Sequence, residues 1–272
     1  MKRTFYILIS LLMISSGVNA KGFRFEYQKT IDITGPIKLS LENPSGGIII
    51  TGMASEKVSI EAVKNVRAAD AEEAEEIGSL IAIDVKQNKN NIDIETIYHR
   101  SAKRSRSFWD KLLGTGDDSF GSVDYNIAVP AQCQLTLKTA SGNIEISGLK
   151  ENIFIDGESG DIFLHNVDGS SDIKTSSGEI KAEDIRGDIS IDATSGKITL
   201  NSITGIIDIR TTSGGTRGSS LFGEITISHT SGEIDLKGLN GDIKIKSTSG
   251  DIIIEQESGA ADIVSYSGTI TV

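Results

Sequence analysis

The chain has 272 residues, with 27 Lys and Arg against 38 Asp and Glu, so its formal net charge is −11. This acidic balance argues against nucleic acid and anionic lipid as general partners. The single cysteine, Cys133, excludes an intramolecular disulfide, and 29 Gly with only 3 Pro indicate regular tight turns rather than a linker.

The N-terminus has the layout of a secretory signal peptide. A basic Met1-Lys2-Arg3 precedes a mostly apolar run over residues 4–17, and Val18-Asn19-Ala20 fits a cleavage site after Ala20. The apolar run is shorter than the ~20 residues that span a bilayer, so a transmembrane anchor is the less favoured alternative. We therefore expect residues 1–20 to direct export and the mature chain to have no membrane span. Periplasmic, cell-surface and extracellular locations all fit this expectation.

Residues 21–140 show no fixed period and are predicted to form a β-rich cap with one short helix. The acidic segment 68–78 is the predicted helix. Strand-like runs occur at 23–27, 29–34, 37–41, 58–63, 81–86, 92–97, 123–129 and 134–139. We expect this region to cover one end of a stack of strands, which would otherwise leave an open strand edge.

The segment 98–121 differs in composition from the rest of the chain. It combines basic residues with the only tryptophan, and its candidate contact residues for a partner are Arg104, Arg106, Phe108 and Trp109. The alternative interpretation is a solvated loop between two strands. If the segment does bind, a membrane surface or a partner at the cell envelope fits its mixture of cations and apolar side chains.

Residues 141–272 form an uninterrupted repeat of 18 residues. Ser-Gly recurs at this spacing from Ser141 to Ser267, and a second glycine follows in mid-repeat, from Gly169 to Gly259. Each half of the repeat contains an Ile-x-Ile alternation, which is typical of a short strand with one apolar face. Stacking such units in register buries the apolar faces and pairs the backbone groups, so we predict an all-β, parallel β-solenoid in which each 18-residue coil has two short strands. An antiparallel meander is less favoured, because its loop lengths would vary.

One earlier segment anticipates this repeat. The residues from Ser45 to Met53 (SGGIIITGM) align with those from Ser141 to Leu149 (SGNIEISGL). The solenoid is therefore expected to begin near Ser45 and to be interrupted by a long insertion.

The sequence offers little sign of catalysis, and we expect no catalytic residue, cofactor or metal. The three histidines lack metal-binding spacing, there is no Gly-x-Ser-x-Gly motif, and the repeated serine is interpreted as a turn residue. The Gly-Gly-x-Gly-x-Asp turn of calcium-binding β-rolls is also missing. The coil from Ser213 to Thr230 departs from the pattern, because Thr216 and Gly218 replace inward apolar residues. A shallow site around Arg217 is the functional interpretation, and a dent in the stack is the simpler one.

The main enzymatic alternative is a carbohydrate-active β-helix, in which a pair of carboxylates cleaves a glycosidic bond. Outward charges that could serve there are spread over several coils, and the simpler interpretation is a solubilising face. They are Asp188, Asp192, Asp208, Arg210, Lys244 and Lys246.

The chain resembles the bacterial "putative adhesin" β-strand-repeat family, also called toast-rack proteins. The likeness rests on Val129-Pro130, on the Lys-Thr-x-Ser-Gly turn from Lys138 to Gly142, and on the Ser-Gly ladder that follows. It covers the mature chain from about Ile31 to Val272 except 98–121, and it implies an envelope or surface role without any catalytic residue. We therefore expect an exported, non-catalytic adhesin-like or structural module with a protein or glycan partner. The alternative is a polysaccharide-binding or polysaccharide-cleaving β-helix.

Overall fold

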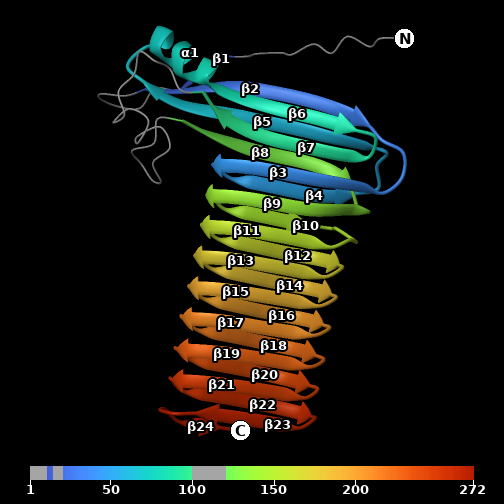
Figure 1. The fold of residues 1–272 in the computed structure, drawn as a ribbon, viewed down its shortest axis with the longest axis vertical. Coiled ribbons are helices and arrows are strands. Elements are labelled where there is room, and N and C mark those ends of the chain that lie inside the picture. The colour runs from blue at the N-terminus through green and yellow to red at the C-terminus, as the bar shows by residue number, and fades with distance from the viewer. Residues whose placement is uncertain (1–10, 15–20, 100–120) are drawn as a thin grey trace.

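The computed structural model describes residues 11–14, 21–99 and 121–272, and for 11–14 the backbone only. These residues form a rod of two facing β-sheets, with α1 (Ala71–Leu80) at the N-terminal end and the C-terminus at the other (Figure 1). The predicted all-β solenoid is confirmed, because successive coils pair in parallel at 18-residue offsets, as in Ile144 with Ile162 and Ile162 with Ile180. The antiparallel meander is excluded for this region.

The strands of each sheet are given in their spatial order, from the N-terminal end of the rod. Sheet A consists of β1 (Leu11–Ile14), β2 (Lys21–Asp32), β5 (Lys57–Ala68), β8 (Gly121–Pro130), β4 (Ile48–Met53), β10 (Ile144–Ser147), β12 (Ile162–Asp168), β14 (Ile180–Arg186), β16 (Ile198–Thr204), β18 (Thr216–Phe222), β20 (Ile234–Asn240), β22 (Ile252–Ser258) and β24 (Ile270–Thr271). Sheet B consists of β6 (Ile81–Asn88), β7 (Asn91–Tyr98), β3 (Ile37–Ser45), β9 (Cys133–Ser141), β11 (Ile153–Ser159), β13 (Ser171–Ser177), β15 (Ile189–Ser195), β17 (Ile207–Ser213), β19 (Ile225–Ser231), β21 (Ile243–Ser249) and β23 (Ala261–Ser265).

The core is built from ladders of like residues between the sheets. In sheet A the first inward position stacks isoleucine on isoleucine from β4 to β16, and in sheet B the first inward position does the same from β15 to β21. The residues that close the turn between half-repeats, such as Val167 and Ile185, are also buried. Full burial of each such side chain contributes about 1.5–3 kcal/mol, so the regular core supplies stability along the whole rod.

The Ser-Gly turns require glycine for two reasons. Gly160 has φ +119°, a region that side chains rarely adopt, and a Cβ placed there would lie 2.2 Å from the carbonyl oxygen of Gly142 in the preceding coil. The serine of each turn is structural as well. The hydroxyl of Ser195 donates to the carbonyl of Ser176 at 3.2 Å, and the hydroxyls of Ser213, Ser231 and Ser249 make the equivalent bond. The repeated serine is therefore a turn residue, as predicted.

The first coil of the solenoid is inserted between later ones. In sheet A, β4 lies between β8 and β10, and in sheet B, β3 lies between β7 and β9. Ser45 pairs with Ser141 and Ile48 with Ile144, which confirms that the repeat begins near Ser45 and is interrupted. The chain leaves the stack after β4, forms β5, α1, β6 and β7, and rejoins it through β8 and β9.

The elements outside the repeat extend both sheets at the N-terminal end. In sheet A, β2 and β5 add antiparallel strands beside β8, and in sheet B, β6 pairs antiparallel with β7. The helix α1 begins after Asp70, whose carboxylate accepts the Glu73 N–H at 2.9 Å. This cap explains why the helix starts three residues later than expected from the sequence. Ala74 and Ile77 are buried on its inner face.

Candidate functional site

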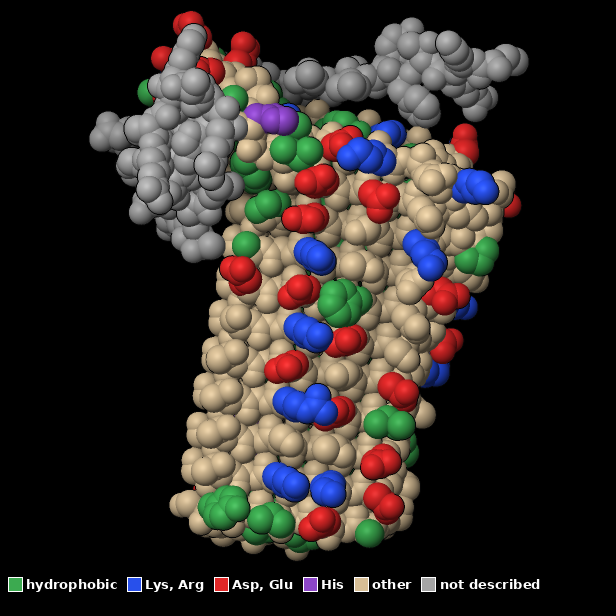
Figure 2. Space-filling model, viewed as in Figure 1, with side chains coloured by type: hydrophobic (Ala, Val, Ile, Leu, Met, Phe, Trp, Pro, Cys, Tyr) green, Lys and Arg blue, Asp and Glu red, His purple; other side chains and the backbone are tan. Residues whose placement is uncertain are grey.

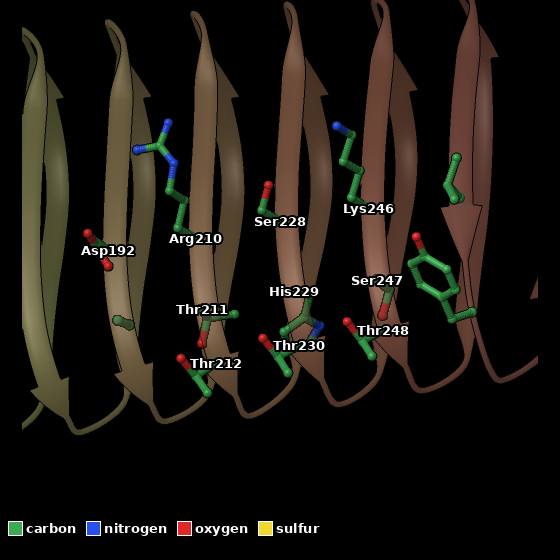
Figure 3. A pocket seen from close by; sticks show the side chains of 13 residues that line it. Asp192, Arg210, Thr211, Thr212, Ser228, His229, Thr230, Lys246, Ser247 and Thr248 are labelled. Atoms are coloured by element: carbon green, nitrogen blue, oxygen red, sulfur yellow. The ribbon is translucent and has the colours of Figure 1, made fainter.

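A groove of about 510 Å³ runs along the outer face of sheet B, near the C-terminal end of the rod. It crosses β15, β17, β19 and β21, so equivalent positions of successive coils lie side by side in it (Figure 3). Its lining residues are Asp192, Ala193, Arg210, Thr211, Thr212, Ser228, His229, Thr230, Lys246, Ser247, Thr248, Val264 and Tyr266.

One side of the groove belongs to a column of outward residues whose charges alternate. Each member pairs in register with the next across neighbouring strands, from β3 to β21. In order, the column is Glu42, Lys138, Asp156, Lys174, Asp192, Arg210, Ser228 and Lys246. Figure 2 shows acidic and basic side chains following one another down this face. Opposite charges on adjacent strands stabilise a sheet by about 0.2–1 kcal/mol per pair, so the column supports the stack.

The alternation stops at Ser228. The pattern would place an acid there, between Arg210 and Lys246, but the residue is a small neutral one. Arg210 forms an ion pair with Asp208, which lies two residues before it on the same strand face. Lys246 has no ion pair within the described part of the chain. The groove therefore contains two exposed cations on either side of a neutral gap (Figure 3).

The opposite side of the groove is lined by hydroxyl groups. Thr212, Thr230 and Thr248 recur at 18-residue spacing, point to solvent and lie in one row (Figure 3). The next residue at this spacing is Tyr266, which is 86% exposed. The groove thus offers hydroxyls and an aromatic ring opposite its cations.

His229 lies beneath the groove and points into the rod. It pairs in register with Thr211 and Ser247, so the histidine is specific to its coil. It is only 4% exposed, and neither ring nitrogen has a hydrogen-bond partner among the described residues. Burial lowers the pKa of His229, and the nearby Gly214 carbonyl opposes this shift only in part.

A second groove on sheet B contains more carboxylates. It lies toward the start of the strands β9 to β17 and includes Asp172, Asp188 and Asp208. Two of the three are engaged: Asp208 pairs with Arg210, and Asp188 accepts the Ile206 N–H at 2.9 Å. This leaves Asp172 as the one carboxylate of this groove without such a contact in the described region.

The candidate partner-contact residues from the sequence do not gather in the groove. Arg104, Arg106, Phe108 and Trp109 lie outside the described residues. Arg217 lies on β18 in sheet A, away from the groove in sheet B, and its guanidinium is 3.5 Å from the Glu233 carboxylate.

The irregular coil around Arg217 is packed without a dent on the inside. Thr216 is fully buried, and a Cβ at Gly218 would lie 2.7 Å from Leu221 Cδ1 and 2.8 Å from Leu236 Cδ2. The two leucines therefore fill the space that an apolar side chain occupies in other coils.

Other reactive groups are buried or dispersed. Cys133 is buried, and burial raises the pKa of its thiol to about 12. Within residues 21–99 and 121–272, no three His, Cys, Asp or Glu side chains are grouped so that they could hold a metal ion. In the same part of the chain, no helix is long and apolar enough to cross a membrane.

The sequence contains the signal for the groove, although the charges taken singly suggest only a solubilising face. Taking every eighteenth residue from Lys138 gives the alternating column directly, together with its interruption at Ser228. Asp192, Arg210 and Lys246 were recognised as outward charges, whereas Ser228 and the exposed Tyr266 were missed.

Comparison with solved structures finds bacterial proteins of low sequence identity. A "putative adhesin" from Parabacteroides distasonis is 13% identical, with a TM-score of 0.48, and the match covers 91% of this chain and 97% of that one. A "putative adhesin" from Bacteroides fragilis is 15% identical, with a TM-score of 0.41 and the same coverage. A protein from Parabacteroides distasonis described as a "putative lipid binding protein" is 15% identical, with a TM-score of 0.42, over 90% of this chain and 94% of that one.

A search of curated proteins finds no match. The family model named Toastrack DUF4097 matches residues 38–214, from the first coil of the solenoid to the turn before β18. This range is well over half of the chain and contains most of the stacked coils. The chain therefore belongs to the Toastrack DUF4097 family.

Proposed function

We propose that the chain is an exported, non-catalytic recognition module that holds a partner at the bacterial cell envelope. The observation that carries this proposal is the open groove on sheet B, where side chains from successive coils present cations, hydroxyls and an aromatic ring. The backbone beneath it is a continuous parallel ladder, so these groups are held at fixed spacing. A rigid, repetitive surface of this kind suits binding to an extended partner.

The arrangement of the groove supports a non-catalytic role. Asp192 is the only carboxylate among the lining residues, whereas glycoside hydrolysis requires two. Ser228 and His229 are neighbours in the sequence, but residues in succession along a strand point to opposite faces. Ser228 faces the groove and His229 the core, so they do not form a nucleophile and base pair.

A polysaccharide-cleaving protein is the second candidate. The three carboxylates of the other groove favour it, since paired carboxylates are the usual catalytic groups. Against it, Asp188 and Asp208 already serve a turn and an ion pair. If this groove cleaved a polysaccharide, Asp172→Asn would abolish the depolymerising activity. Under the non-catalytic proposal, neither the original protein nor the variant shortens the polymer.

Export is the part of the proposal that rests on the first 20 residues. Cleavage after Ala20 predicts a mature chain that begins at Lys21, the first residue of β2. Expression of the full chain in a bacterial host, followed by fractionation and intact mass measurement, tests this directly. A cytoplasmic protein that retains Met1 to Ala20 would contradict it.

The binding role is tested with the exported protein on a glycan array, on intact bacterial envelopes, and in a depolymerisation assay. We expect saturable binding without any shortening of the polymer. A shortened polymer would replace the proposal by the enzymatic candidate. If the protein binds none of the glycans and none of the envelope preparations, the recognition role is overturned.

A further inference from the structure

We infer that the gap at Ser228 is a subsite for the carboxylate of a linear acidic glycan, held between Arg210 and Lys246. This inference rests on the proposed recognition role and names its ligand. Its basis is the one interruption in the column that runs from Glu42 to Lys246, in which every other adjacent pair joins opposite charges.

The spacing of the two cations suits one anionic group. Arg210 and Lys246 lie on β17 and β21, with β19 between them, so their backbones are roughly 10 Å apart. The Arg210 side chain is directed away from Ser228, toward the strand of Asp192, and would have to turn to contact a ligand in the gap (Figure 3). Both side chains are long, and the small serine leaves the space between their strands open. A carboxylate there would stand where Asp156 and Asp192 stand between cations elsewhere in the column.

Both cations retain capacity for a ligand. The described residues contain no ion-pair partner for Lys246. Arg210 uses its contact with Asp208, but a guanidinium has five N–H donors and one carboxylate occupies two at most. Charge-assisted hydrogen bonds to a ligand carboxylate are therefore available on both sides of the gap.

The rest of the groove favours a sugar polymer as the carrier of this carboxylate. The groove runs across successive strands, so it suits an extended chain rather than a compact ligand. Thr212, Thr230 and Thr248 provide hydroxyls that can exchange hydrogen bonds with sugar hydroxyls. Tyr266, at the C-terminal end of the groove, presents a ring on which the apolar face of a sugar can stack. The acidic surface elsewhere disfavours binding of a polyanion outside this place.

The test uses two ligands and two matched variants of the full exported chain. The ligands are an oligogalacturonate and its methyl ester, which keeps the sugar and removes the charge. Ser228→Asp supplies the missing acid of the column, and Ser219→Asp makes the same change on β18, in the opposite sheet. Affinities are measured by calorimetry at low and high salt, and folding is followed by thermal unfolding.

We expect the oligogalacturonate to bind at least about tenfold more tightly than its methyl ester, with weaker binding at high salt. Ser228→Asp should reduce that affinity by about tenfold or more and raise the unfolding midpoint, because the new carboxylate pairs with both cations. Ser219→Asp should leave the affinity unchanged.

Three results would overturn the inference while the recognition role stands. Equal binding of both ligands, or binding that Ser228→Asp does not weaken, would show that the gap is not the carboxylate subsite. No binding of either ligand by a protein that still binds intact envelopes would reject an acidic glycan while keeping the recognition role. If the protein binds neither ligand and also fails to bind intact envelopes, both the inference and the recognition role are rejected.

Discussion

The carboxylate of Asp161 accepts the backbone N–H of Glu179, one coil further along the rod, at 2.8 Å. Asn143 makes the same contact with the N–H of Asp161, and Asp251 with that of Thr269. These side chains follow the glycine of the Ser-Gly turn, a position at which repeated acids suggest a calcium site. Their role in this structure is to satisfy a turn N–H that lies outside the strand ladder.

Asp161→Ala should therefore lower the free energy of unfolding by about 1–2 kcal/mol, because it removes a hydrogen bond to a charged acceptor. The Glu179 N–H would then be hydrogen-bonded to water instead. Asp161→Asn should cost less, since Asn143 already fills this role in the preceding coil. Urea unfolding measures the difference. Glu179→Ala is the matched control, because Glu179 forms only an exposed ion pair with Lys197. An equal loss in the control would contradict the explanation.

The turn glycines provide a second prediction. Gly160→Ala should destabilise the protein by at least about 2 kcal/mol, because the backbone is in the left-handed region and the new Cβ would strike the Gly142 carbonyl. Gly157→Ala is the control, three residues earlier on β11. Its Cβ would meet no atom closer than 3.7 Å, and Ala193 occupies the equivalent inward position two coils later. Thermal unfolding should show a large loss for the first variant and little change for the second.

The repeat made most of this fold predictable. Once Ser-Gly recurs without insertion, the pairing of Ile144 with Ile162 follows, because a slip of one residue would turn every isoleucine to solvent. The structural role of the turn serines and the burial of residues such as Val167 also follow from their recurrence every 18 residues.

The order of the first coils could not be read from the repeat. Residues 54–120 separate β4 from β8, and nothing local shows that β8 lies on the far side of β4 from β10. That arrangement depends on long-range pairing, such as Ile48 with Tyr125, which has no period in the sequence. The groove is hard to predict for a different reason: no single charge indicates it, and the alternation is visible only when every eighteenth residue is compared.

A buried hydrogen bond joins the two sheets near the point where the chain returns to the stack. The hydroxyls of Thr96 on β7 and Tyr125 on β8 lie 2.7 Å apart, and both residues are buried. Tyr125→Phe should cost about 1–3 kcal/mol of unfolding free energy, because the Thr96 hydroxyl loses its partner in the core. Tyr98→Phe is the control, since its buried hydroxyl has no partner in the described part of the chain. Chemical unfolding should therefore show a loss for Tyr125→Phe and no loss for Tyr98→Phe.

His229 should make the stability of the rod depend on pH. Burial lowers its pKa in the folded protein below the ordinary value of about 6.5, so the unfolded chain binds the proton more readily. Stability should then be greatest above pH ~7 and fall as the pH drops through ~6.5 toward the lower folded pKa.

His229→Thr removes this dependence and keeps a side chain that the neighbouring coil accommodates, since Thr211 occupies the same position one coil earlier. Thermal midpoints of the two proteins should therefore diverge between pH ~7 and ~5, with the original protein losing more, while the carboxylates titrate alike in both. Parallel curves over this range would show that the His229 ring is protonated as easily in the fold as in the unfolded chain.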